Sequence, residues 1–245
     1  MTNAQMPIGH IGVTEGYTYA NVDAVDVTVF GVGGHGAYPH KTKDPVVLAA
    51  EMISMWQTIA SRENNPIDPI VVTVGSIHGG TKHNIIPDEV KMQLTVRTYK
   101  ADVRDRVLAA ISQIAKGVAS AGGVPADRMP AVTVLNEGLP ATYNNPELTR
   151  RLVTVWKRAL GDENVQMVDP TMGGEDFSEY SLADHSIPAV DFHIGAVDPA
   201  KIAEYKKEGK ELPSLHSSKF APVPEPTIRT GIIGMTTAVL ELMKK

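Results

Sequence analysis

A histidine in a glycine-rich loop is the first residue whose surroundings suggest chemistry. His35 lies in the segment Gly31-Val32-Gly33-Gly34-His35-Gly36-Ala37-Tyr38-Pro39-His40. The alternating valines before it predict a strand with one buried face at residues 24–32. Four glycines leave the backbone around the imidazole bare, which permits a left-handed conformation and close approach by another molecule. The pattern predicts either a ligand-facing histidine at a strand end or a connecting loop whose histidine only caps a neighbour.

The same glycines match the spacing of a dinucleotide-binding loop, Gly31-x-Gly33-x-x-Gly36. Such a loop needs a helix to begin at its third glycine, so that the helix N-terminus can hold a pyrophosphate. In this chain Pro39 and Pro45 follow before any helical pattern begins. We therefore expect no nucleotide at this loop.

The elements that would position the loop follow in a regular order. Asp44 and Pro45 are favourable residues for the start of a helix, which we expect to reach Arg62. Apolar periodicity then predicts strands at residues 70–77 and 90–97, a helix at 101–121 and a strand at 131–135. The order β-α-β-β-α-β predicts a ferredoxin-like domain, with four antiparallel strands and two helices on one face.

The remaining segments predict part of a second, α/β domain. Residues 1–20 are glycine-rich and are expected to be irregular, with short extended pieces. Helices are predicted at residues 146–160 and 225–243, and a strand at 187–194. These pieces offer too few strands for a sheet covered on both faces, so we expect a domain whose other part lies elsewhere.

Composition excludes several classes of function. The chain has 245 residues, a formal net charge of −5 and no cysteine. The acidic balance argues against nucleic acid or an anionic membrane as partner, and no apolar run is long enough to cross a bilayer. The absence of cysteine excludes disulfides and thiolate zinc sites. The first seven residues do not form a signal peptide, which fits a cytoplasmic protein.

Several motifs, taken together and in order, resemble the aminoacylase/amidohydrolase branch of the dinuclear-zinc M20 peptidase family. The matching segments are Gly34-His35-Gly36-Ala37-Tyr38-Pro39-His40, Asp44-Pro45, His83-Asn84-Ile85-Ile86-Pro87-Asp88, Val96-Arg97-Thr98, Gly173-Gly174-Glu175-Asp176-Phe177 and Leu215-His216-Ser217. Each motif alone is weak, whereas the ordered set covers nearly the whole chain. The resemblance implies hydrolysis of the amide of N-acyl amino acids or similar conjugates. It also implies that residues 21–137 are an inserted lid that dimerises, and that residues 1–20 and 138–245 belong to the catalytic domain.

The resemblance also implies a role for each matching residue. His35 would reach the active site of the partner subunit and stabilise the tetrahedral oxyanion, as a donor aimed at developing charge can do. Asn84 and Arg97 would bind the substrate carboxylate, which the planar guanidinium fits with two hydrogen bonds. Gly173 and Gly174 would offer backbone N–H groups to the substrate. His216 would be a metal ligand.

Other parts of the family pattern are absent. The resemblance implies two divalent metal ions, zinc or manganese, but the remaining ligands and the general base belong to an upstream half that this sequence does not show. A further ligand histidine of the family corresponds to Met1. Catalytic zinc needs three protein ligands or more for each ion, and one is identified here. We therefore expect the C-terminal part of an amidohydrolase, inactive alone, or one that an upstream catalytic fragment completes in trans.

Two further functions remain open. The chain alone fits a non-catalytic dimerisation module or an amino-acid-binding module, because the ferredoxin-like domain has edge strands that can pair across a two-fold axis. A small-molecule-sensing regulatory domain would share the same fold.

Overall fold

The computed structural model describes residues 1–183 and 186–244, and it divides the chain into two compact units. The inserted unit comprises residues 19–141 together with 172–176. The terminal unit comprises residues 1–18, 142–171 and 177–245.

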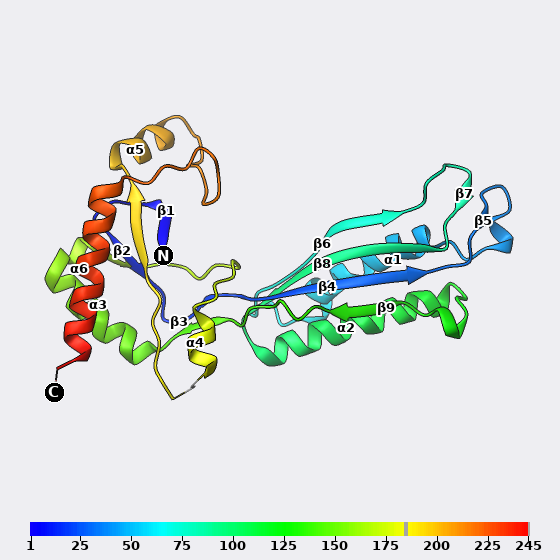
Figure 1. Ribbon diagram of the computed structural model, residues 1–245, viewed down its shortest axis with the longest axis horizontal. Coiled ribbons are helices and arrows are strands. Elements are labelled where there is room, and N and C mark those ends of the chain that lie inside the picture. The colour runs from blue at the N-terminus through cyan, green and yellow to red at the C-terminus, as the bar shows by residue number, and fades with distance from the viewer. Residues whose placement is uncertain (184–185, 245) are drawn as a thin grey trace. The chain divides into compact units, whose positions relative to one another are not determined.

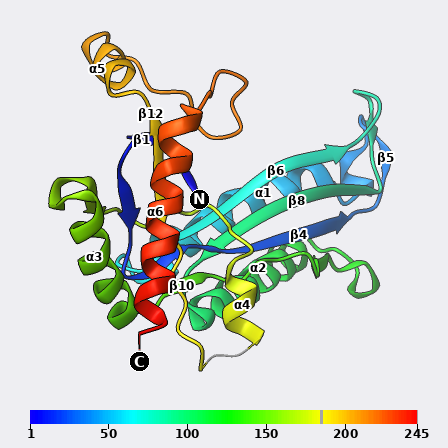
Figure 2. The same cartoon turned by 60° about the vertical axis from the view of Figure 1, so that its left-hand side comes forward.

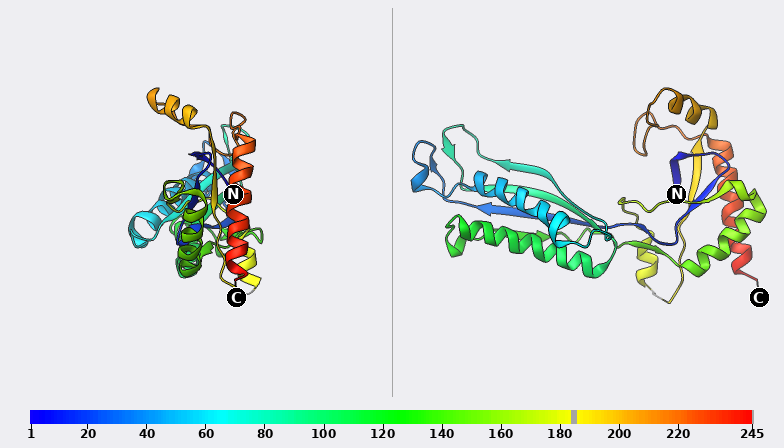
Figure 3. Two further views of the ribbon diagram at one scale, coloured as in Figure 1. Left: turned by 90° about the vertical axis from the view of Figure 1, so that its left-hand side faces the viewer. Right: turned by 180° about the vertical axis from the view of Figure 1, so that it is seen from behind.

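The inserted unit is a four-stranded antiparallel sheet with two helices on one face (Figures 1 and 3). The sheet order is β6-β8-β4-β9, which is the ferredoxin-like arrangement predicted from the sequence. Its elements are β4 (Asn21–Phe30), α1 (Pro45–Thr58), β6 (Ile70–Gly79), β8 (Glu89–Thr98), α2 (Ala101–Ala121) and β9 (Ala131–Val134). A two-stranded sheet lies at one end of the long strands and consists of β5 (Gly34–His35) and β7 (Ile85–Ile86).

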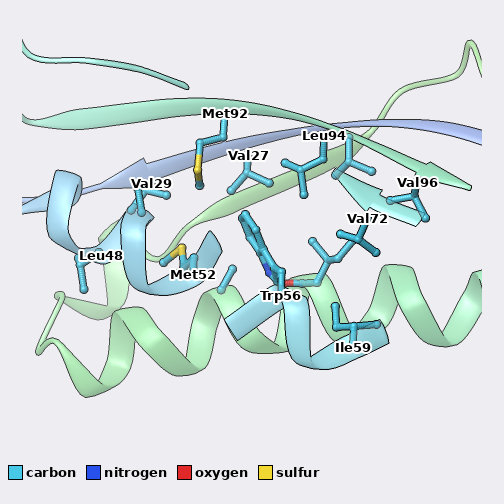
Figure 4. Packing of buried hydrophobic residues seen from close by; sticks show 14 of the residues in the cluster. Val27, Val29, Leu48, Met52, Trp56, Ile59, Val72, Met92, Leu94 and Val96 are labelled. Atoms are coloured by element: carbon cyan, nitrogen blue, oxygen red, sulfur yellow. The ribbon is translucent and has the colours of Figure 1, made fainter. Parts of the chain in front are cut away.

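The core of the inserted unit lies between the sheet and the two helices (Figure 4). Alternate residues of β4 and β8 face the helices, and Trp56 of α1 is fully buried against them. The Trp56 indole N–H donates to the carbonyl oxygen of Ile111 at 3.1 Å, so the ring also joins α1 to α2. The other face of the sheet stays polar and open, which is the alternation expected of an antiparallel sheet with one covered face.

Local signals in the sequence explain where the helices begin. The Asp44 carboxylate accepts from the Val46 N–H at 2.9 Å, with Pro45 in the first helical position, as predicted. The Asn145 side chain accepts in the same way from the Leu148 N–H at 2.9 Å. Helix α2 has the predicted bounds, and Gly123 just beyond it has a φ of 69°. Helix α1 continues at Ile59 as a π-helical turn that ends at Glu63, so the helical segment reaches the predicted end near Arg62.

The terminal unit contains a four-stranded mixed sheet with the order β1-β12-β2-β11. Its strands are β1 (Thr2–Pro7), β2 (Ile11–Val13), β11 (Val165–Met167) and β12 (His193–Val197). A two-stranded sheet joins β3 (Gly16–Tyr19) to β10 (Thr142–Asn144). The helices are α3 (Pro146–Leu160), α4 (Ser178–Ala183), α5 (Pro199–Lys207) and α6 (Pro224–Leu242), with α3 and α6 packed together (Figure 2).

Two expectations for the terminal unit are wrong. The first twenty residues are not irregular, because three strands form there and pair with segments far away in the sequence. The strand expected at residues 187–194 begins only at His193, after a segment in which Ile187 is 60% exposed. The buried Asn144 holds this segment instead, since its amide donates to Asp191 O at 2.8 Å and its Oδ1 accepts from Asp191 N at 2.7 Å.

No helix within the described ranges is both long and apolar enough to cross a lipid bilayer.

Candidate functional site

The His35 loop is held by backbone contacts with the segment that precedes β8. The Gly31 N–H donates to Asp88 O at 2.8 Å, and the Gly33 N–H donates to the Asp88 carboxylate at 3.0 Å. One residue past His35, the Gly36 N–H donates to Asn84 O at 2.8 Å. These bonds hold the His35 loop beside the segment that contains Asn84, and His35 pairs with Ile85 in the β5–β7 ladder.

The glycines of this loop are required for close approach of the chain to itself. A Cβ atom at Gly31 would overlap the carbonyl oxygen of Lys43, and one at Gly33 would lie 2.8 Å from Ile86 O. None of the described glycines between residues 31 and 36 has a positive φ, so the expected left-handed conformation is not what they provide. A 3-10 turn at Pro39–Lys41 follows the loop and helix α1 begins only at Pro45, so no helix begins at Gly36.

The hydrogen bonds of His35 determine which ring nitrogen carries the proton. The Ala37 backbone N–H donates to His35 Nδ1 at 3.0 Å. A nitrogen that accepts a hydrogen bond has no proton, so the neutral ring carries its proton on Nε2. The side chain is exposed, and Tyr38 lies beside it with 5.5 Å between ring centroids. The loop therefore presents an Nε2–H donor to an incoming group.

Arg97 lies at the other end of the same sheet. Its Nε donates to Thr95 Oγ1 at 2.9 Å, which fixes the guanidinium on the open face of β8. Gly174 lies next to it, because a Cβ atom there would be 3.5 Å from Arg97 Nη1 and would overlap Val22. The Gly173 carbonyl accepts from the Ala20 N–H at 2.9 Å, which ties the glycine pair to the start of the inserted unit. Arg97, Gly173 and Gly174 therefore form one cluster, which we call the arginine cluster.

The remaining two predicted site residues of this unit form a second cluster at the opposite end. His35 and Asn84 are both exposed there and are joined through the Gly36 backbone; we call them the histidine cluster. Strand β4 runs from Val22, opposite Arg97, to Phe30, opposite Glu89. Eight residues of extended strand span about 26 Å, so the two clusters lie at opposite ends of a strand of about that length. Asn84, which was predicted to bind a carboxylate together with Arg97, lies beside His35 within one chain.

His216, the predicted metal ligand, lies in a turn of the terminal unit. Its φ is 65°, a left-handed value that side-chain-bearing residues seldom adopt, and it is the one such non-glycine residue among those the structure describes. The Ser217 hydroxyl accepts from the Lys219 N–H at 3.2 Å and closes the turn. A residue held in a sparsely populated conformation by its surroundings is a feature of functional sites.

The structure also contains a partly buried pair of titratable side chains that sequence reasoning missed. Asp191 and His193 flank Phe192, and the amino group of Met1 donates to Phe192 O at 2.8 Å. Burial raises the pKa of the Asp191 carboxyl and lowers the pKa of the His193 imidazole, and the charge of each partly opposes the shift of the other. Met1 is the position that the family resemblance assigned to a ligand histidine.

The described residues do not by themselves form a metal centre. Within residues 1–183 and 186–244, no group of three or more His, Cys, Asp or Glu side chains could hold a metal ion. The described residues alone therefore do not form a dinuclear centre, although His216 has the chemistry of a ligand.

The larger grooves do not coincide with these clusters. A groove of about 960 Å³ lies between α1 and α2 and is lined mainly by apolar residues, Val46, Val47, Met55, Ile114 and Val118 among them. It contains no histidine and only one carboxylate, Glu51, so it suits packing rather than catalysis. A smaller hollow of about 350 Å³ lies at the histidine-cluster end, beside Ile85 and Asp88.

Comparison with known proteins gives one family. The model of a peptidase dimerisation domain, M20_dimer, matches residues 20–122, which is most of the inserted unit. Thermostable carboxypeptidase 2 of Saccharolobus solfataricus is 29% identical over 99% of this chain and 57% of its own length. N-acetyldiaminopimelate deacetylase of Leuconostoc mesenteroides is 34% identical over 87% of this chain and 54% of its own length. The chain spans about half the length of the curated relatives it matches.

Solved structures share the fold over almost the whole chain. A protein of methicillin-resistant Staphylococcus aureus, described as a candidate aminohydrolase, has a TM-score of 0.82 at 27% identity and covers 99% of this chain and 58% of its own. The Bacillus subtilis YXEP protein, a dinuclear metal-binding peptidase, has a TM-score of 0.69 at 22% identity and covers 99% of this chain and 56% of its own. The family model and these relatives agree: residues 20–122 are an M20 dimerisation domain, and the chain is similar over most of its length to M20 peptidases and amidohydrolases.

Proposed function

We propose that this chain is part of a metal-dependent amidohydrolase that cleaves N-acyl amino acids, and that its site is completed across a homodimer. The observation that carries the proposal is the position of the two clusters at opposite ends of one rigid sheet. Neither cluster can serve the other in the same chain, because a small substrate cannot bridge about 26 Å. A two-fold axis that brings opposite ends together would make two equivalent sites.

The edge strand β6 is suited to such an axis. Among the described strands of this sheet it pairs only with β8, and its sequence, Ile70-Val-Val-Thr-Val-Gly-Ser-Ile-His-Gly79, contains no Lys, Asp, Glu or Pro. Natural edge strands usually carry such residues to prevent pairing, so this edge is open to a partner strand. Antiparallel pairing of β6 with its copy would set the two sheets side by side in opposite directions. The histidine cluster of one chain would then lie near the arginine cluster of the other.

The residues have complementary tasks in this arrangement. The Arg97 guanidinium, held by Thr95, would bind the carboxylate of the substrate with two parallel hydrogen bonds. The partner's His35 would donate from Nε2 to the oxygen that becomes negative when the amide carbonyl is attacked. Its neighbour Asn84 would add a second polar group from the same partner loop. The backbone at Gly173 and Gly174 is exposed and would offer N–H groups to the substrate beside Arg97.

The metal ions require residues from outside this chain. The relatives extend well beyond the matched region, and the described residues offer His216 but no full ligand set. We infer that two divalent ions, zinc or manganese, bind only in the completed catalytic domain, and that the chain alone does not turn over substrate.

The experiment is a comparison of the chain alone with the chain co-expressed with the unmatched part of a relative. The assay is release of acetate from N-acetyl amino acids at saturating zinc or manganese. The proposal predicts no turnover by the chain alone and turnover in the completed complex that falls at least 100-fold in the Arg97→Ala variant. Turnover by the chain alone would contradict it, and so would a complex that remains as active without Arg97.

The alternative of an amino-acid-binding module has one observation in its favour. The arginine cluster lies wholly within one unit and needs no metal to bind a carboxylate. Titration calorimetry of the chain alone with a free amino acid distinguishes the two functions. Binding in the micromolar range that is lost in Arg97→Ala, without any turnover in the completed complex, would favour the binding module.

A further inference from the structure

Helix α6 of the terminal unit buries its small residues and exposes its large apolar ones. The side that packs on α3 and β12 carries Thr227, Thr230, Gly234 and Ala238, all buried. Gly234 is the closest point of this contact: its carbonyl accepts from the Trp156 indole N–H at 2.9 Å, and a Cβ atom there would lie 2.8 Å from Ile11. This face alone explains how α6 is held.

A second face of α6 has no partner in the part of the chain that the structure describes. Large apolar residues recur on it at spacings of four and three, and each is at least 43% exposed: Ile228, Ile232, Met235, Val239 and Leu242. We call this set the α6 stripe. The N-terminal part of the stripe, Ile228 and Ile232, lines a hollow of about 480 Å³ beside Pro224 and Ile233. The sequence from Thr230 to Leu240 contains no charged residue. A helix that is apolar on two faces is normally buried on both.

Spacing and charge limit what can cover the stripe. Alternating four- and three-residue steps form a straight seam along one side of a helix, which fits another helix or the face of a sheet. A membrane surface is a poor fit, because helices that lie on bilayers carry several Lys or Arg beside the apolar face, and α6 carries Arg229 alone within its bounds.

The relatives indicate the origin of the partner. The Saccharolobus carboxypeptidase matches 99% of this chain but only 57% of its own length, and the Staphylococcus structure shares the fold over 99% of this chain and 58% of its own. The fold of the terminal unit is thus one that relatives build within a longer polypeptide. The terminal unit thus exposes an apolar stripe, and each relative has a large additional segment that could cover it.

We propose that the α6 stripe is the docking surface for the remainder of the catalytic domain, the polypeptide that corresponds to the unmatched part of the relatives. That polypeptide presents an apolar helix or sheet face to Ile232, Met235 and Val239. The inference goes beyond the proposed reaction, since it concerns assembly of the domain and needs no catalytic activity.

The absence of cysteine makes the stripe directly testable. A single thiol is introduced by Ile232→Cys on the stripe, and the matched control is Thr236→Cys, at an exposed position of α6 outside the stripe. Each full-length variant is purified alone and co-expressed with the unmatched part of the Saccharolobus carboxypeptidase, and the rate of labelling by a thiol reagent is measured.

In the chain alone both thiols are expected to react at similar rates. In the co-expressed complex the rate at position 232 should fall at least tenfold while that at position 236 stays within twofold. Equal rates with and without the second polypeptide would overturn the proposal, and so would failure of the two polypeptides to co-purify. Protection at position 232 that rises with the concentration of the chain alone would also overturn it, because the occupant would then be a second copy. Labelling does not depend on turnover, so failure of the proposed reaction would leave this result intact.

Discussion

Substitution of Ile77 on the edge strand β6 tests the dimer that the two clusters require. Ile77 is 48% exposed and pairs with Met92 of β8, so half of its side chain is free to be covered by a partner. Full burial of an isoleucine is worth up to about 3 kcal/mol, and covering the exposed half is worth about 1–1.5 kcal/mol. A two-fold axis places Ile77 of both subunits in the interface. Ile77→Lys should therefore weaken the free energy of dimerisation by about 2–3 kcal/mol, which raises the dissociation constant by a factor of roughly 30–150.

Sedimentation equilibrium of the chain gives that dissociation constant directly. The matched control is Val134→Lys on β9, the opposite edge of the sheet, where the valine is 41% exposed. The control should dimerise as the parent does, and both variants should keep the parent's circular dichroism and unfolding midpoint. A monomeric parent would refute the reasoning. Equal weakening by both variants, or no weakening by Ile77→Lys, would show that β6 is not the interface.

Three further predictions concern single side chains. The buried Asp23 carboxylate accepts hydrogen bonds from Arg104 at 2.6 and 2.9 Å. Arg104→Ala should therefore lower the free energy of unfolding in urea by about 3 kcal/mol, whereas Arg106→Ala, at an exposed ion pair, should lower it by at most about 0.5 kcal/mol. Similar losses in the two variants would contradict a stabilising role of the buried pair. Burial lowers the pKa of His193 in the folded state below its unfolded value, so the neutral ring contributes its full share of folding stability above about pH 6.5. That stability is lost as the pH falls through about 6.5 and then through the lower folded pKa. Thermal melts between about pH 7.5 and 5 should show the decline in stability, and His193→Gln should make it smaller. Nitrogen chemical shifts of His35 should identify the tautomer protonated on Nε2, and a proton on Nδ1 would remove the basis for its role as a donor.

The sequence was most informative about the inserted unit because its signals are local. Alternation in β4 and β8, the cap at Asp44 and the long stripe of α2 are each determined within one segment, and their order specifies the ferredoxin-like sheet. The terminal unit was harder to predict. Strands of three to six residues such as β1 and β2 show little alternation, and they exist because they pair with β12 and β11 more than 150 residues away.

The site residues show the same division between local and distant information. Motifs identified His35, Asn84 and Arg97 as candidates, but their grouping depends on register. The ladder in which Val22 pairs with Arg97 and Phe30 with Glu89 places Arg97 at one end and the His35 loop at the other. The sequence predicted a helix at residues 225–243, whereas the choice of Gly234 for its inner face depends on the close contact with Trp156 and Ile11.

The most direct test of the central claim is a cross-link between the two clusters. Single variants His35→Cys and Arg97→Cys are made in the cysteine-free chain, mixed so that subunits exchange, and treated with a short bis-maleimide. We predict a covalent dimer in the mixture of the two variants, little in either variant alone, and no internal cross-link in a chain that carries both substitutions and is diluted with unmodified chain. An internal cross-link in that diluted double variant, or no covalent dimer in the mixture, would contradict a site shared between two subunits.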